Sequence, residues 1–147
     1  MTAESKPMNR IFFYGLFMDR TLLAGQGLRP EVVGPAVLPE YRIHIGERAT
    51  LLQSPGRRAF GVVMTLTGQE ADDLYSEPSV REYVPVRVQV ELLETNEVVA
   101  ASCYNLPPEL GLAGANPAYA IKLAQLVEVL GFDAAYVEEI AVFGEVP

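Results

Sequence analysis

The stretch YVPVRVQVELLETNEVVAASCYNL, residues 83–106, constrains the fold more than any other part of the chain. Valine occupies every second position from Val84 to Val90, with arginine, glutamine or proline between. Side chains of a strand alternate between its faces, so this spacing is typical of a β-strand with unlike faces. Thr95-Asn96 is a turn signal, and a second apolar run follows. The pattern therefore predicts a β-hairpin that continues through residues 98–104.

Further strands are predicted on the N-terminal side of this hairpin. Residues 11–14 (IFFY) are apolar and read as a buried strand, and residues 31–47 are strand-like on both sides of Pro39. Residues 49–68 predict a strand, a turn at Ser54-Pro55-Gly56 and a second strand through Val62, Val63 and Met64. Pro85 cannot donate to a ladder, so at that position the strand lies at an edge or directs its amide side outward.

Helices are predicted where capping residues precede apolar positions at helical spacing. Asp19 can begin a helix of at most about two turns that stops at Gly25 or Gly27. The other N-terminal signals are a capping box of Thr67 with Glu70, Asn116 before Pro117, and Asp133. The order of elements suggests an α+β domain whose largely antiparallel sheet can curl into a barrel.

The length of 147 residues predicts a single domain, residues 10–147, after a polar tail, residues 1–9, that we expect to be disordered. A net charge of −8 argues against nucleic acid or an anionic membrane as a partner. The one cysteine permits no internal disulfide, and the N-terminus has no apolar signal region. We expect a soluble cytoplasmic protein, either a monomer or a homodimer.

Few residues suggest chemistry by themselves. One His and one Cys leave no His/Cys metal site, and no nucleophile triad, P-loop or Rossmann turn is evident. His44 fits a half-buried strand position, and Cys103 fits a small core residue. Arg57-Arg58 fit a solvated loop tip, although they could meet an anionic substrate. Asp72-Asp73 fit a solvated helix face rather than a metal site.

Two features leave open whether the chain has a functional site. In RIFFYGLFMDRTLL, residues 10–23, a strand ends at Tyr14-Gly15 and apolar residues then fill the turn. Turns usually take polar residues, so either other segments bury this turn or its backbone meets a ligand. Glu77 comes where a helix runs into Pro78, so it is either a surface glutamate or a carboxylate at the mouth of the sheet.

Several segments together resemble the γ-glutamylcyclotransferase-like family. They are the Tyr-Gly turn at Phe13-Tyr14-Gly15-Leu16-Phe17, the strand FGVVMTLT, the segment Leu74-Tyr75-Ser76-Glu77 followed by Tyr83 and alternating valines, the strand ASCYNL with Tyr104, and the C-terminal NPAYAIKLAQLVEVLGFDAAYVEEI. The resemblance spans most of residues 11–140 and rests on the order and spacing of these short motifs. It implies a small mixed, largely antiparallel β-barrel flanked by short helices.

The resemblance also implies a reaction that needs no cofactor. The α-amine of a γ-glutamyl amine or γ-glutamyl amino acid attacks its own γ-amide, which releases 5-oxoproline. Backbone amides of Tyr14, Gly15, Leu16 and Phe17 would hold the α-carboxylate, and Glu77 would act as general base and then acid. Tyr83 and Tyr104 would line the pocket, or are core tyrosines.

The sequence departs from the family pattern in ways that keep alternatives open. Leu16 stands where a small residue or threonine is usual, so the turn either narrows the pocket or directs this side chain into the core. Pro78 follows Glu77 in place of glycine, and Glu82 adds a charge beside Tyr83. The alternatives are a non-catalytic member that binds a small anionic ligand or a protein, and a related transfer or lyase-like reaction on another amide.

Overall fold

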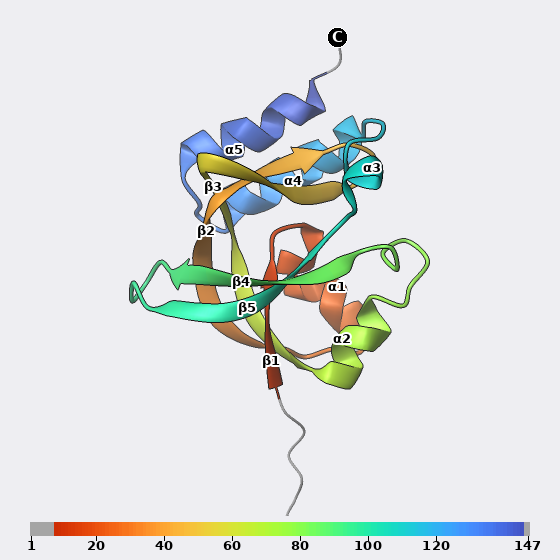
Figure 1. Ribbon diagram of the computed structural model, residues 1–147, viewed down its shortest axis with the longest axis vertical. Helices are drawn as coiled ribbons and strands as arrows, with labels where there is room; N and C mark the ends of the chain where they lie inside the picture. The colour runs from red at the N-terminus through yellow and green to blue at the C-terminus, as the bar shows by residue number, and fades with distance from the viewer. Residues whose placement is uncertain (1–7, 146–147) are drawn as a thin grey trace, which may run out of the picture.

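Five β-strands close into a barrel in the order β1-β3-β2-β4-β5 (Figure 1). The computed structural model describes residues 8–145. Neighbouring strands are antiparallel except β1 and β5, which pair in parallel with Ile11 opposite Ser102. The strands are β1 Met8–Phe13, β2 Glu31–Ile45, β3 Ala49–Thr67, β4 Val84–Leu92 and β5 Val98–Asn105. The expected α+β fold with a mixed, largely antiparallel barrel is confirmed.

The helices within residues 8–145 are α1 Arg20–Gly25, α2 Gly68–Leu74, α3 Pro108–Gly111, α4 Pro117–Val129 and α5 Ala134–Ala141, with 3-10 turns at Leu16–Met18 and Val142–Gly144. All but α3 begin after a capping residue that the sequence predicts. Asp19, Asn116 and Asp133 each accept a hydrogen bond from a backbone amide of the following first turn. Thr67 and Glu70 form both bonds of a capping box. The short helix α3 lacks such a signal and was not predicted.

The prediction that residues 54–56 form a turn between two strands is wrong, because a single strand, β3, runs through them. The chain keeps its direction there, and β3 pairs with β2 on both sides of an irregularity in which residues 54–57 lie opposite Glu40 alone. Glu40 accepts a hydrogen bond from the amide of Gly56 at 2.6 Å, and both residues have positive φ angles, 69° and 80°. The turn-forming residues therefore make a bulge within a long hairpin, because both flanks find partners on the same strand.

The ends of two strands differ from the simplest interpretation of the sequence. β1 begins at Met8, which pairs with Thr67, so residues 8 and 9 belong to the barrel. The rest of the expected N-terminal tail, residues 1–7, lies outside the described residues.

In β4, Val88 and Val90 are buried, whereas Val84 and Val86 are 51% and 38% exposed. β4 contacts β2 only near its far end, so the half that contains Pro85 is a sheet edge, as predicted.

Helices α4 and α5 pack against each other and lie at the top of the view in Figure 1. Tyr136 of α5 contacts the ring of Phe60, with ring centroids 4.9 Å apart. His44 is half-buried and meets Phe143 edge to face, and Cys103 is fully buried in the core, as expected for both. Within residues 8–145, no helix is long and apolar enough to cross a membrane.

Candidate functional site

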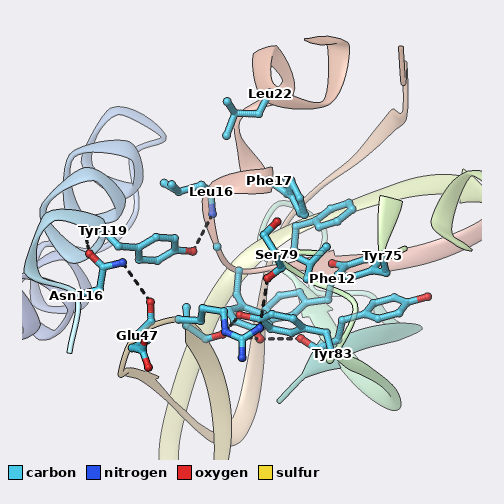
Figure 2. Close-up of a pocket in the computed structure, with 17 residues that line it drawn as sticks. Phe12, Leu16, Phe17, Leu22, Glu47, Tyr75, Ser79, Tyr83, Asn116 and Tyr119 are labelled. Atoms are coloured by element: carbon cyan, nitrogen blue, oxygen red, sulfur yellow. Dashed lines mark hydrogen bonds between the residues drawn. The ribbon is translucent and has the colours of Figure 1, made fainter. Parts of the chain in front are cut away.

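A pocket of about 350 Å³ opens where β1 ends (Figure 2). Its wall comes from the turn after β1, the β2–β3 turn, the segment between α2 and β4, and the start of α4. The lining is mostly aromatic and aliphatic, with few charged side chains. The lining residues are Phe12, Phe13, Tyr14, Gly15, Leu16, Phe17, Leu22, Glu47, Arg48, Ala49, Tyr75, Ser79, Val80, Tyr83, Tyr104, Asn116 and Tyr119.

The turn after β1 lines the pocket and packs its side chains against the core. Leu16 and Phe17 both line the pocket and pack against the core. Phe17 lies edge to face with Phe13 and with Tyr75, each with ring centroids 6.1 Å apart. The amides of Gly15 and Phe17 make no hydrogen bond within residues 8–145. Apolar residues suit this turn because neighbouring segments half-bury it, and two of its amides have no partner within residues 8–145.

Tyr119 completes the turn from the side of α4. Its hydroxyl accepts a hydrogen bond from the amide of Leu16 at 3.3 Å (Figure 2). A Cβ on Gly15 would stand only 2.6 Å from the same hydroxyl oxygen, so any larger residue there must displace the hydroxyl. Asn116 caps α4 by accepting a hydrogen bond from the Tyr119 amide at 3.1 Å. This bond fixes the backbone from which the Tyr119 ring extends. The Tyr119 hydroxyl proton bonds to no acceptor within residues 8–145, so it is available to a ligand.

Other tyrosine hydroxyls tie the pocket wall to the barrel. Tyr14 donates to the Tyr104 carbonyl at 2.7 Å, and Tyr83 donates to the Ala49 carbonyl at 2.6 Å. The rings of Tyr75 and Tyr104 stack with centroids 3.8 Å apart and planes 6° from parallel. The aromatic wall of the pocket is therefore held by directed contacts as well as by burial.

Burial keeps these hydroxyls protonated. It raises the pKa of Tyr14 and Tyr75 well above the usual value of 10.0, and it also raises the pKa of Tyr83 and Tyr104. Burial raises the pKa of Tyr119 to about 12, although the bond from Leu16 opposes part of this shift. Near neutral pH these side chains are hydrogen-bond donors and acceptors, not general bases.

Two charged residues line the pocket, Glu47 and Arg48. Nη1 of Arg48 lies 2.8 Å from Oε1 of Glu82. The Glu47 side chain is exposed, but the backbone of this residue is fixed, since its amide donates to the Ala113 carbonyl at 2.8 Å. Its carbonyl accepts from the Asn116 side chain at 3.1 Å. Within residues 8–145, no group of three or more His, Cys, Asp and Glu side chains could hold a metal ion.

The structure brings most of the predicted site residues together but leaves one apart. Six of them line a single pocket, namely Tyr14, Gly15, Leu16, Phe17, Tyr83 and Tyr104. Glu77 is exposed and does not line it. The carbonyl of Glu77 accepts from the Val80 amide at 3.0 Å, and Ser79 and Val80 do line the pocket. The predicted general base therefore lies beside the pocket.

Two lining tyrosines were missed as site residues. Tyr75 lies within the Leu-x-x-Glu motif, and Tyr119 is the third residue of α4. The Asn-Pro capping signal could have placed Tyr119 in the first turn of a helix. It could not have brought that turn against residue 16, because only tertiary packing does so.

The chain is similar to one protein family in sequence and to several solved structures in fold. The profile of the family described as "Gamma-glutamyl cyclotransferase, AIG2-like" matches residues 11–122. A solved structure named "Gamma-glutamyl cyclotransferase" has a TM-score of 0.75 at 18% identity, covering 91% of this chain and 86% of the other. A search among curated proteins finds no significant match.

Two further solved structures share the fold. YkqA from Bacillus subtilis has a TM-score of 0.75 at 23% identity, covering 95% of this chain and 55% of its own. A Homo sapiens protein described as uncharacterized has a TM-score of 0.73 at 19% identity, with coverages of 90% and 86%. At these identities the likeness of the structures shows the fold alone.

Proposed function

We propose that this chain, which belongs to the family of AIG2-like γ-glutamyl cyclotransferases, is itself a γ-glutamyl cyclotransferase. It would release 5-oxoproline from a γ-glutamyl amino acid or a γ-glutamyl amine. The observation that supports this most is the pocket around the turn after β1, which is lined by residues whose amides have no partner within residues 8–145 and by Tyr119, whose hydroxyl proton is unbonded there. Such a site holds an anionic group without a charged side chain.

The γ-glutamyl group would bind with its α-carboxylate at this turn. The amides of Gly15 and Phe17 supply two donors that have no partner within residues 8–145. The Tyr119 hydroxyl supplies a third, since it already accepts from the Leu16 amide. Hydrogen bonds to an ionised acceptor are about twice as strong as neutral ones. The aromatic walls would then enclose the chain of methylene groups.

The reaction itself is a rearrangement of the substrate's own bonds. The deprotonated α-amine attacks the γ-carbonyl carbon, and a new C–N bond closes the five-membered ring. The carbonyl oxygen becomes an oxyanion, which preorganised donors stabilise. The original γ-amide C–N bond then breaks, and the leaving nitrogen takes up the proton that the α-amine lost. The products are 5-oxoproline and a free amine, and no water is consumed.

One carboxylate can move this proton in both directions, and we assign that role to Glu77. Its side chain lies outside the pocket, so the mechanism requires residues 76–79 to turn inward when substrate binds. The distance is short, because Ser79 already lines the pocket and two residues span at most about 7 Å. Residues 76–79 are all exposed, so little packing opposes such a movement.

The second candidate function is non-catalytic binding of a small anionic ligand in the same pocket. The exposure of Glu77 favours it, since a binding protein needs no carboxylate near the ligand. The two functions agree about the turn after β1 and differ about residue 77. The role of Glu77 is therefore the point to test.

The test is an end-point assay for 5-oxoproline with a panel of γ-glutamyl amino acids, γ-glutamyl amines and glutathione. We expect product from the wild type and a rate at least about 10²-fold lower for Glu77→Gln. Glu97→Gln, at an exposed position in the β4–β5 turn, is the matched control and should match the wild type. Equal rates for wild type and Glu77→Gln would remove Glu77 from the mechanism and direct attention to Glu82 and Glu47.

Absence of product from every substrate would contradict the proposed activity. Thermal stabilisation of the protein by the same compounds would then favour the binding function, because a ligand that binds only the folded state raises its stability.

A further inference from the structure

Arg48 is the only cationic side chain among the described residues that line the pocket. It is the last residue of the turn between β2 and β3, and its side chain is 29% exposed. The proposed reaction assigns it no role, since the turn amides bind the α-carboxylate and a glutamate moves the proton. A half-buried guanidinium is stabilised by an anionic partner, and within residues 8–145 that partner is the half-exposed Glu82, 2.8 Å from Nη1.

The contacts of Arg48 leave part of its guanidinium free. Nη1 makes both polar contacts, at 2.8 Å to Glu82 and at 3.3 Å to the Ser79 carbonyl. Neither Nε nor Nη2 forms a hydrogen bond within residues 8–145. A guanidinium presents five N–H donors in a planar fork that matches a carboxylate. One edge of this fork is therefore available to a carboxylate ligand.

Arg48 contacts a different part of the pocket wall from the turn that would hold the glutamyl group. Its contacts are with residues 79–83, including the Tyr83 ring, whose centroid lies 5.9 Å from the guanidinium carbon. It makes no hydrogen bond with the turn after β1, where Leu16 and Tyr119 interact. An anion at Arg48 would thus belong to another part of the substrate than the α-carboxylate.

The part of the substrate that would reach Arg48 is the leaving group. An amino acid that leaves from the γ-amide has a carboxylate of its own, whereas a simple amine has none. Burying this second negative charge in an apolar pocket is costly unless a cation pairs with it. Glu82 is 47% exposed, and exposed ion pairs contribute little, so a substrate carboxylate can replace it at small cost.

We propose that Arg48 determines specificity by binding the carboxylate of an amino-acid leaving group, so that γ-glutamyl amino acids are preferred over γ-glutamyl amines. This inference rests on the proposed cyclotransferase function and deepens it. Arg48 takes no part in the proton transfer. It positions the amide for attack by holding the far end of the substrate.

The test compares two substrates that differ by one carboxylate, γ-glutamylalanine and γ-glutamylethylamine. We expect the wild type to favour γ-glutamylalanine in kcat/KM. Arg48→Gln should lower kcat/KM for γ-glutamylalanine at least about tenfold more than for γ-glutamylethylamine, because a hydrogen-bonded ion pair is lost. Arg81→Gln, an exposed arginine of the same segment, is the control and should keep the wild-type ratio.

The ratio of kcat/KM between the two substrates separates a role of Arg48 in specificity from a general structural role. Arg48 also holds the Ser79 carbonyl, and loss of that bond would slow both substrates equally. A second variant keeps Arg48 and removes its competitor: Glu82→Gln should raise the preference for γ-glutamylalanine. An equal decrease for both substrates in Arg48→Gln, or a wild-type preference for the ethylamine, would overturn the inference alone. No 5-oxoproline from either compound would instead overturn the proposed function, and the inference with it.

Discussion

The two sides of the pocket differ in how firmly they are held. The turn after β1 is covered by Tyr119 and bonded to it through Leu16, and Tyr14 behind it is buried and bonded to β5. The segment that contains Glu77 is exposed over residues 76–79. Its described side-chain hydrogen bonds to the barrel come from Arg48 and Tyr83.

This difference suggests a division of labour in the molecule. A binding surface works best when it is preorganised, because no ordering then opposes ligand binding. A segment that must bring a carboxylate to a bound substrate has to retain freedom of movement. The fixed side would therefore select the γ-glutamyl group, and the free side would complete the site after binding.

Gly15→Ala should disturb the turn after β1 and cause the largest loss of kcat/KM among these variants. The φ angle of Gly15 is −105°, which alanine also adopts, so the backbone is not strained. The new Cβ would lie 2.6 Å from the Tyr119 hydroxyl and must displace it. We expect kcat/KM to fall about 10- to 100-fold, since displacements near 1 Å can cost that much.

Gly25→Ala is the matched control, because a Cβ there meets nothing within 4 Å. Its activity should equal that of the wild type. Equal activity of Gly15→Ala and Gly25→Ala would show that the contact between the turn and Tyr119 has no part in binding.

Tyr119→Phe should have the next largest effect, about tenfold in kcat/KM, because a hydrogen bond to a charged group of the ligand is lost. Tyr136→Phe provides the comparison. Its hydroxyl also bonds to a backbone group, the Phe60 carbonyl at 3.3 Å, but the residue does not line the pocket. Both variants should lose about 1 kcal/mol of unfolding free energy in urea titrations. A similar loss of activity in both would argue that Tyr119 acts only through stability.

Tyr83→Phe should sharpen the contrast between the two sides. It removes the bond to the Ala49 carbonyl, so opening of residues 76–83 should become about fivefold more frequent, as expected for the loss of about 1 kcal/mol. Hydrogen–deuterium exchange would report this as faster exchange in 76–83 with unchanged exchange in 14–18. Equal acceleration in both segments would contradict the view that they are held independently.

Alkaline pH should produce the smallest and most general effect. The pocket tyrosines have raised pKa values, so above about pH 10 the unfolded chain loses protons that the folded chain keeps. Stability is therefore fully present below that pH and decreases as pH rises towards the folded-state pKa values. Unfolding free energies measured on both sides of pH 10 should show this decrease. A flat profile would mean that these hydroxyls are not buried in solution.

Local signals in the sequence predicted much of the fold. Capping residues located the starts of α1, α2, α4 and α5 because each cap bonds within its own first turn. The sequence at the bulge of β3 predicts a turn, since Pro55-Gly56 has the same local chemistry in both settings. Pairing with β2 decides between them, and that partner is distant in sequence.

The candidate site, too, depends on partners that are distant in the sequence. The turn at Tyr14-Gly15 was recognisable because its apolar residues conflict with ordinary turn chemistry. Tyr119 and Arg48 reach the pocket from α4 and from the β2–β3 turn, and their spacing in the sequence gives no sign of it. The exposed position of Glu77 was equally hidden, since a glutamate before proline fits a surface loop and a pocket mouth alike.

The most direct test of this account is a crystal structure of Glu77→Gln with a bound γ-glutamyl amino acid. We predict the α-carboxylate at the amides of Gly15 and Phe17. We also predict residues 76–79 turned inward, so that the side chain of residue 77 lies within about 3.2 Å of the α-amine or the amide nitrogen. A ligand held at the turn while residue 77 remains in solvent would contradict the proposed role of Glu77 and favour a binding protein.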